Sequence, residues 1–343
     1  MILYGEFMKI FNSVLFIVLL ISSHLIAQNK VGTTAAEFLT IPIGPRATSM
    51  GGAFIASAND VTAAYWNPGA LSRITTSEFQ AAYADWIFDT KHNWVGVAVK
   101  LDDDNTFALS FNQLDYGQEE ITTEEEPNGT GQYWDASDIA IGLSYSRNLT
   151  DRFSIGGTFK YINSKIWNES ASAFALDVGL LFKTQLEGLR LAMNISNFGT
   201  EMKLDGPDLF SAIDIDESNF GNNPNISGKL ETDSWELPLT FTVGAAMDLM
   251  DNEDWLFTVA TDAIYPINTT AYLNMGTEIV WNKLVFLRTG YTSLFEEASE
   301  EGLSAGVGIK YNISGFNFGI DYSFVDFGQF DNISRYSLSI SFN

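Results

Sequence analysis

The sequence predicts an all-β fold, a transmembrane antiparallel β-barrel of about fourteen strands with an N-terminal plug. Three observations predict it. Stretches of alternating apolar and polar residues fill the chain from Ser77 to its end, the connections between them are alternately short and long, and a segment of small residues precedes them. Outer-membrane barrels combine strands of about ten residues with short turns at one end and longer loops at the other.

The last three strands show the alternation most clearly. In residues 303–311, 316–324 and 336–342, every second residue is apolar and usually large, and the residues between are mostly small or polar. Because successive side chains of a strand point to opposite faces, each strand has one apolar and one polar face. A soluble sandwich also alternates, but it has no reason to sort its loops by length.

The same criterion divides the rest of the chain. The predicted strands are 78–86, 94–101, 106–116, 137–147, 152–165, 173–182, 189–198, 235–249, 255–265, 271–281, 284–291, 303–311, 316–327 and 333–342. Every second connection is a short turn, such as 102–105 or 148–151. The intervening connections are longer, and the segments 117–136 and 199–234 are much longer. The two long segments are therefore predicted to be external loops.

The first 27 residues are interpreted as a secretory signal peptide. Met8-Lys9, an alternative start, is followed by the apolar run 10–20, and a cleavage site is predicted after Ala27. The run is shorter than the roughly twenty apolar residues of a helical membrane span. The predicted domains are thus a signal peptide (1–27), a hatch or plug (28–76) and the barrel (77–343).

Composition restricts the possible functions. The chain has no cysteine, which excludes disulfides, thiolate metal sites and cysteine nucleophiles. Its net charge of -25 argues against nucleic acid as a partner. No cofactor or metal motif is present. We expect no enzyme activity, since the one histidine of the predicted mature chain, His92, is expected in the first external loop and no Gly-x-Ser-x-Gly turn accompanies it.

The segment 31–74 does not fit a strand pattern and is rich in small residues. Asp60 is a good N-cap for a short helix ending at Trp66, and Asn67-Pro68-Gly69 would stop that helix. Small residues allow backbones to approach closely. We therefore expect a plug in the periplasmic end of the lumen; the alternative is a periplasmic tail that packs on the rim.

This segment resembles the PorV/PorQ family of outer-membrane proteins, a branch of the FadL-like group. The matching pieces are residues 31–39, 44–46, 50–53 and 60–71. Where family members usually have Asn-Pro-Ala-Gly-Leu, this chain has Asn67-Pro68-Gly69-Ala70-Leu71, a swap that keeps the turn chemistry. The resemblance implies a fourteen-stranded barrel with an N-terminal hatch.

Two functions are implied by the resemblance. One is that of a type IX secretion accessory protein, which binds C-terminal signal domains of secreted cargo, or translocon and attachment-complex proteins. The alternative is FadL-like uptake of a hydrophobic ligand through a moving hatch. Both place the chain in the outer membrane of a gram-negative bacterium, among its lipids, with the long loops extracellular. The candidate hatch or gate residues are Arg46, Met50, Gly51, Gly52, Asp60, Asn67 and Pro68.

The secretion function is favoured by two sets of residues. The faces assigned to the lumen carry charges expected to pair across it, which suits a closed scaffold better than an apolar channel. They are Lys160, Asp177, Glu236, Glu278, Arg288, Lys310, Asp321 and Arg335. The long loops carry apolar residues of the kind that anchor protein interfaces. The candidates there are Tyr133, Trp134, Leu209, Phe210 and Phe220.

Overall fold

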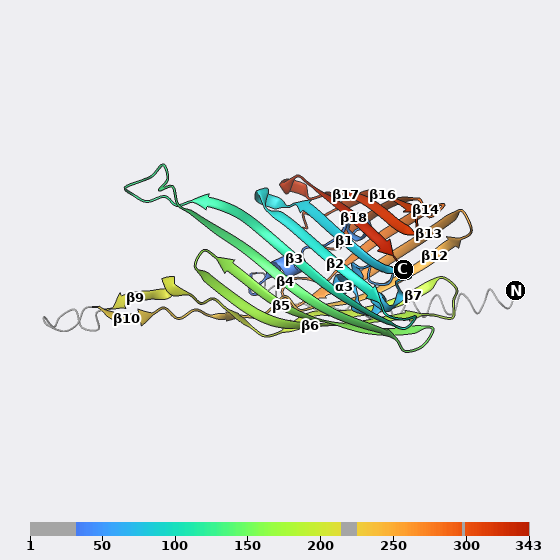
Figure 1. Ribbon diagram of the computed structural model, residues 1–343, viewed down its shortest axis with the longest axis horizontal. Coiled ribbons are helices and arrows are strands. Elements are labelled where there is room, and N and C mark those ends of the chain that lie inside the picture. Colours follow the sequence, from blue (N-terminus) through green and yellow to red (C-terminus); the bar gives the residue numbers. More distant parts are fainter. Residues whose placement is uncertain (1–31, 214–224, 297–298, 343) are drawn as a thin grey trace. The chain divides into compact units, whose positions relative to one another are not determined.

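The computed structural model describes residues 32–213, 225–296 and 299–342 (Figure 1). In this part of the chain, fourteen antiparallel strands form a closed barrel, and a segment preceding β1 lies inside it. The predicted fold class and strand number are confirmed. The predicted signal peptide lies outside the described residues.

Nine of the fourteen barrel strands are longer than predicted, whereas β12, β14 and β17 are shorter. The fourteen strands are β1 (Ser77–Asp85), β2 (Lys91–Lys100), β3 (Asn105–Glu120), β4 (Tyr133–Asn148), β5 (Phe153–Ile166), β6 (Glu169–Lys183), β7 (Leu189–Gly199), β12 (Thr240–Asp251), β13 (Trp255–Pro266), β14 (Tyr272–Trp281), β15 (Val285–Leu294), β16 (Leu303–Ile313), β17 (Phe316–Asp326) and β18 (Asn332–Phe342).

Each barrel strand pairs with its neighbours in the sequence, apart from two joints. β7 pairs with β12 across the longest connection, and β1 closes the barrel on β18 with Ser77 opposite Phe342. The alternation explains the two faces: Ile320 and Leu338 are exposed on the outer face, whereas Ser304 and Ser339 are buried inside. An apolar outer face is what a barrel surrounded by lipid requires.

The two ends of the barrel differ, as the connection lengths predicted. At the short-turn end, six connections contain between two and five residues, 314–315 being the shortest and 184–188 the longest. At the other end, the long-loop end, β3 and β4 continue past the rim as a hairpin (Figure 1). The two ends of the predicted loop 117–136 are therefore strand, and residues 121–132 connect them. The β5–β6 connection, expected to be long, contains only Trp167 and Asn168.

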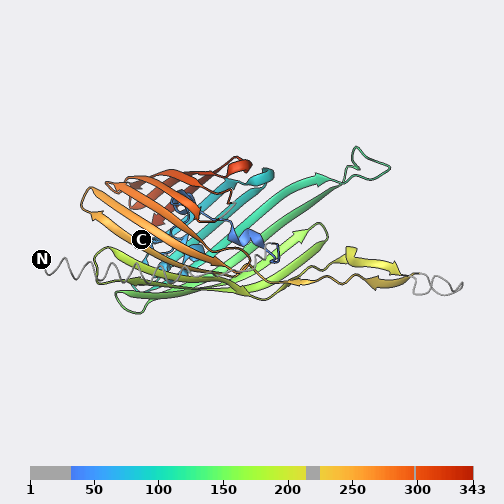
Figure 2. The same ribbon diagram turned by 180° about the vertical axis from the view of Figure 1, so that it is seen from behind.

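The second long segment has structure of its own at the long-loop end. It contains β8 (Met202–Lys203), η4 (Pro207–Leu209), β9 (Phe210–Ile213), β10 (Ile226–Lys229) and β11 (Ser234–Trp235). β9 pairs with β10, and β8 pairs with β11. Figure 2 shows the β9–β10 hairpin projecting beyond the barrel strands. The prediction that a barrel strand begins at Trp235 is wrong, because β12 starts only after Pro238, which has no N–H to donate to a ladder.

From residue 32 onward, the plug has four short helices: η1 (Glu37–Thr40), α2 (Pro45–Ser49), α3 (Ala63–Trp66) and η2 (Pro68–Arg73). Two further 3-10 turns, η3 (Ile87–Asp89) and η5 (Gly328–Phe330), lie in loops. None of the helices in the described ranges is long and apolar enough to cross a membrane.

The plug extends farther through the lumen than predicted. The Ala35 amide donates to the Glu236 carbonyl at 2.8 Å, at the long-loop end. Nη1 of Arg73 donates to the Asp151 carbonyl at 2.9 Å, in a turn at the short-turn end. The expectation of a plug confined to the end with short turns is therefore wrong, because the segment runs between both ends.

The main apolar core lies between the plug and the inner wall. Met50, Phe54 and Leu71 of the plug are completely buried. The wall meets them mostly with small residues, among them Ala98 and Ala246. Alanines on an inner wall leave the volume that the plug fills, so plug and barrel share one core.

Candidate functional site

The plug is joined to the wall by one ion-pair network around Arg46 of α2. Nε and Nη2 of Arg46 donate to the two carboxylate oxygens of Glu278 at 3.0 and 2.8 Å, a bidentate pair. Nη1 donates to Asp60 Oδ2 at 2.9 Å. Arg46 therefore connects two parts of the plug with β14.

The network continues along the wall. Arg288 on β15 donates from Nε to Glu278 and from Nη1 to Asp321 on β17, both at 2.6 Å. Arg288 and Glu278 face each other in the register of β14 and β15. All three side chains are buried, so each charge is stabilised by its partners rather than by water.

Asp60 organises the turn before α3 from a different position than predicted. The N-cap of α3 is Thr62, and Asp60 Oδ1 accepts a hydrogen bond from the Thr62 amide at 3.0 Å and another from the Thr62 hydroxyl. Burial alone would raise the pKa of Asp60, but the charge of Arg46 and the Thr62 hydroxyl bond hold this pKa below its usual value. Asp60 is thus a charged partner of Arg46.

Met50, Gly51 and Gly52 form one close approach of the plug to the wall. The Gly51 amide donates to Ser304 Oγ at 3.0 Å, and the Gly51 carbonyl accepts from Thr292 Oγ1 at 3.1 Å. Gly51 has φ +64°, and a Cβ there would lie 2.6 Å from the Tyr291 amide nitrogen. Only glycine fits both the backbone conformation and the space.

Asn67 and Pro68 hold the second contact, on the opposite wall. The Asn67 side chain donates to the carbonyls of Ile55 at 2.9 Å and Leu180 at 3.1 Å. Its Oδ1 accepts from the Gly69 amide, which starts η2 with Pro68 in the first turn. The predicted end of the preceding helix at Trp66 is therefore correct, but Asn67 also begins the next helix.

Six of the predicted lumen charges are buried inward, but they do not pair across the lumen as expected. They are Lys160, Asp177, Glu278, Arg288, Asp321 and Arg335. Lys160 on β5 contacts Asp177 on the adjacent β6 at 2.6 Å. The pairs join nearby strands, or the wall to the plug, because the plug occupies the space between opposite walls.

The other two predicted lumen charges differ in position. Lys310 on β16 is half-buried, with Nζ 5.6 Å from the centroid of the Phe286 ring. Glu236 is exposed and precedes β12, so its assignment to the inner face is wrong. The wrong assignment of Glu236 follows from the predicted strand start at Trp235, because residues before Pro238 do not belong to β12.

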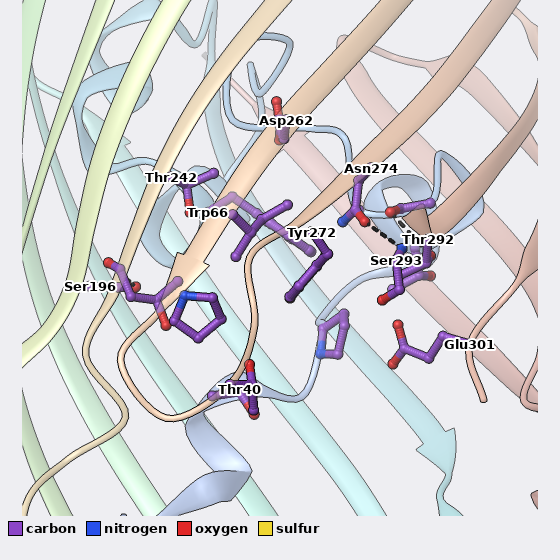
Figure 3. A pocket seen from close by; sticks show the side chains of 18 of the residues that line it. Thr40, Trp66, Ser196, Thr242, Asp262, Tyr272, Asn274, Thr292, Ser293 and Glu301 are labelled. Atoms are coloured by element: carbon purple, nitrogen blue, oxygen red, sulfur yellow. Dashed lines mark hydrogen bonds between the residues drawn. The ribbon is translucent and has the colours of Figure 1, made fainter. Parts of the chain in front are cut away.

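A cavity of about 350 Å³ remains in the lumen between the plug and the wall. Figure 3 shows Thr242, Asp262 and Asn274, from three neighbouring strands, around Trp66 of the plug. Its lining is mixed: Tyr272 and Trp66 provide aromatic surface, and hydroxyl, amide and charged groups provide the rest.

Asp262 and Asn274 line the cavity but were not among the predicted site residues. Asp262 binds the plug, and Asn274 binds the neighbouring strand β15. Asp262 Oδ2 accepts from the amides of Phe54 and Ile55 at 2.7 and 3.0 Å. Asn274 Oδ1 accepts from the Ser293 amide at 2.9 Å (Figure 3). Both lie on the polar faces of predicted strands. The acidic residue between Thr261 and Ala263 is the sequence feature that could have indicated Asp262 as a buried, plug-binding residue.

His92 does not lie in a loop, contrary to expectation. It is buried on β2, and its Nε2 is 2.7 Å from Asn112 Oδ1 on β3. The strand begins at Lys91, three residues earlier than the apolar alternation indicated, because polar residues continue the ladder.

The predicted partner-binding residues lie at the long-loop end. Tyr133 and Trp134 are on β4 rather than in a loop, opposite Glu120 and Glu119 of β3. Tyr133 is exposed and Trp134 half-buried. Leu209 ends η4, and the exposed Phe210 starts β9, with Lys229 Nζ 5.4 Å from its ring centroid. Phe220 lies outside the described residues.

Comparisons with known proteins identify both a family model and a fold. The model of a family described as type IX secretion system protein PorV matches residues 24–212, more than half of the chain. A search of curated protein sequences finds no match.

Solved structures show the same fold at low identity. The CymD monoaromatic hydrocarbon channel is 12% identical with a TM-score of 0.53, covering 88% of this chain and 97% of its own. A Pseudomonas aeruginosa FadL homologue is 12% identical with a TM-score of 0.52, covering 88% and 98%. The Pseudomonas putida toluene transporter TodX is 13% identical with a TM-score of 0.52, covering 87% and 97%. At such identity the likeness concerns the fold, a FadL-like outer-membrane barrel.

Proposed function

Because the chain belongs to the PorV family of type IX secretion system proteins, we propose that it acts as a closed scaffold in the outer membrane. Its long loops bind secreted cargo, through C-terminal signal domains, or proteins of the translocon and attachment complex. The long-loop end faces the cell exterior, as in other outer-membrane barrels. In this role the protein binds partners and catalyses no reaction.

The observation that carries the proposal is the contrast between the two parts of the molecule. The lumen contains a plug that is bound to the wall through the ion pairs of Arg46. The long-loop end carries two projecting hairpins with exposed aromatic and aliphatic side chains, including Tyr133 and Phe210. Aromatic side chains beside charged ones are typical of protein-binding surfaces.

Hydrophobic solute uptake is supported less well. A conduit for such solutes needs an apolar path, yet the inner wall carries the buried charges Glu278, Arg288 and Asp321 next to the plug. Moving the plug would leave Glu278 with one cationic partner fewer. An ion-paired plug of this kind costs more to displace than an apolar one.

The test is secretion in a strain that carries loop-shortened variants in place of the wild-type gene. One variant lacks residues 121–132, and a second lacks the β9–β10 hairpin. The matched control replaces the short turn 282–284 by an unrelated turn of equal length. Folded barrel in the outer membrane is checked in each strain by its heat-modifiable migration in gels.

We expect proteins with C-terminal signal domains to accumulate in the periplasm of the loop-variant strains and not in the control strain. An unchanged set of secreted proteins in the gene-deletion strain itself would contradict the secretion function. Unchanged secretion in both loop-variant strains would contradict the assignment of binding to these loops.

A further inference from the structure

Four aromatic side chains form a cluster at the long-loop end, beside the joint where β1 and β18 close the barrel (Figure 1). Phe327 contacts Trp86, with ring centroids 5.3 Å apart, and also contacts Phe330, at 6.4 Å. Phe330 in turn contacts Phe88 edge-to-face at 5.6 Å. The four residues belong to the loops that contain η3 and η5, which follow β1 and β17. The aromatic cluster therefore joins two neighbouring loops.

The inner half of the aromatic cluster lies in the mouth of the barrel rather than on the lipid-facing surface. Trp86 comes two residues after the buried Ala84, and Phe327 comes two residues after the buried Val325. Residues two apart in an extended chain point to the same side. The buried Arg335 packs on the Trp86 ring, with Cζ 5.2 Å from its centroid. The cluster is therefore distinct from the aromatic girdle that barrels place at the lipid boundary.

The outer half of the aromatic cluster is open to water. Phe88 is 78% exposed and Phe330 is 43% exposed. The backbone around them has positive φ angles, +56° at Phe88, +59° at Asp89 and +63° at Asp331. Residues with a side chain rarely adopt positive φ, which is unfavourable for them. The loops thus present two aromatic rings to water in an unfavourable conformation, a combination typical of binding sites.

The charges around the two exposed rings are all of one sign. Residues 85–90 and 326–334, which form the two loops, contain no lysine or arginine. They contain four exposed carboxylates, those of Asp85, Asp89, Asp326 and Asp331. The lysine that follows, Lys91, lies opposite Asp85 in the register of β1 and β2. Aromatic faces attract cations as well, so the surface is complementary to positive charge next to an apolar group.

We propose that Phe88 and Phe330 form a third protein-docking surface, which binds a partner segment that carries an apolar side chain between lysines or arginines. The apolar side chain packs on the two rings, and the cations lie on the ring faces and beside the aspartates. Lipopolysaccharide fits less well, because its phosphates would face four carboxylates. The proposal rests on the proposed function, in which the long-loop end binds proteins, and adds a surface outside the two projecting hairpins.

The experiment is photo-crosslinking in cells that express the full chain, with p-benzoylphenylalanine placed at one position at a time. Phe88→p-benzoylphenylalanine and Phe330→p-benzoylphenylalanine probe the docking surface. Phe295→p-benzoylphenylalanine is the matched control, because Phe295 is 87% exposed in another loop of the same end. The cross-linked peptides are identified by mass spectrometry, and folding of each variant is checked by heat-modifiable migration in gels.

Two further variants with the probe at Phe88 test the charge complementarity. Asp89→Asn with Asp331→Asn removes two carboxylates beside the rings. Asp103→Asn with Asp104→Asn removes two carboxylates from an exposed turn at the short-turn end and gives the same net charge. The second pair therefore controls for the change in total charge.

We expect protein adducts at Phe88 and Phe330, in partner segments where lysines or arginines flank an apolar residue, and not at Phe295. The adduct yield should fall at least about fivefold in Asp89→Asn with Asp331→Asn, because rim charges steer association, and stay unchanged in the control pair. If one probe prevents folding, the probe at the other phenylalanine decides.

Four results would overturn the proposal. They are the absence of protein adducts at both phenylalanines, adducts with lipid only, adducts with segments that lack basic residues, and a yield that removal of the two aspartates leaves unchanged. Secretion is assayed separately. Loss of secretion in the loop-variant strains without an adduct at Phe88 or Phe330 would reject only this docking surface. An adduct together with unchanged secretion in the gene-deletion strain would reject only the secretion function.

Discussion

At the scale of single residues, the position of the plug depends on a few polar side chains in an otherwise apolar core. Arg46 contacts Asp60 and Glu278 with three different nitrogens, and its side chain is 13% exposed. Glu278 keeps a second cationic partner in Arg288, whereas the ion pair of Asp60 is with Arg46. Removing Arg46 therefore affects Asp60 more than Glu278.

Arg46→Gln should loosen the plug without opening the barrel wall. Breaking such a buried pair costs roughly 3 kcal/mol, because a carboxylate loses its partner. This corresponds to amide hydrogen exchange about a hundredfold faster in plug peptides, at unchanged exchange in the wall strands. Arg152→Gln, which changes an exposed turn, is the control; equal plug exchange in the two variants would refute the role of Arg46.

The stability of the plug should also depend on acid pH through Asp60. Since the folded-state pKa of Asp60 is lowered, its stabilising contribution is present above the unfolded pKa of about 4 and is lost as pH falls through the folded value. Pepsin cleavage of the plug should therefore accelerate below about pH 4. In Asp60→Asn this acceleration should be smaller; an identical pH profile would contradict the assignment.

At the level of secondary-structure elements, the plug is held in place where its backbone contacts the backbone of the barrel strands. The turn at Gly51 meets β15 and β16, and the start of η2 meets β5 and β6, so the plug contacts two opposite parts of the wall. Glycine on the wall completes the approach: a Cβ at Gly290 would overlap the Gly51 amide. Hydrogen bonds then replace the side chains that would separate the two backbones.

Gly51→Ala should displace the plug from this part of the wall. The added Cβ would lie 2.6 Å from the Tyr291 amide nitrogen at a positive φ, so strain and overlap add to more than about 2 kcal/mol. Gly117→Ala is a matched control, because Gly117 has φ +81° and open space around it. We expect faster hydrogen exchange in the plug peptides of Gly51→Ala only; equal exchange in the plug peptides of the two variants would contradict the role of Gly51.

At the scale of the whole molecule, plug and barrel form one packed unit with a small cavity, and binding surfaces lie at the long-loop end. The proposed secretion function needs no movement of the plug. Transport through the lumen would need its displacement, since the plug spans from Ala35 near one end to Arg73 near the other. A disulfide that fixes the plug to the barrel wall would distinguish the secretion function from transport.

The double variant Thr48→Cys and Ser323→Cys should form that disulfide, because the two hydroxyl oxygens are 2.8 Å apart and the chain has no other cysteine. We expect the oxidised variant to support secretion as well as its reduced form and the single Thr48→Cys variant. Loss of secretion on oxidation alone, restored by reductant, would show that the plug moves during function. The cross-link itself is verified by the mass of the intact protein.

The fold class, the fourteen strands, their inner and outer faces and the two kinds of end could be predicted from the sequence. Each strand has lipid on one face and the lumen on the other, so apolar and polar residues alternate with a period of two. The sequence also indicated Arg46, Asp60 and Asn67 as plug residues through local motifs. It did not determine the partners of any charge. The Arg46–Glu278 contact joins residues 232 positions apart, and strand ends such as those of β3 and β12 depend on neighbouring strands.

Which of the inward-facing charges form ion pairs depends on contacts between residues far apart in the sequence. Lys160, Arg288 and Arg335 have the same alternation signal. Lys160 and Arg288 form ion pairs with carboxylates on nearby strands, whereas Arg335 forms no ion pair among the described residues and lines a cavity beside Glu301. The physical reason is that alternation reports the face of a strand, whereas pairing depends on register, on closure of the barrel at β1 and β18, and on the path of the plug.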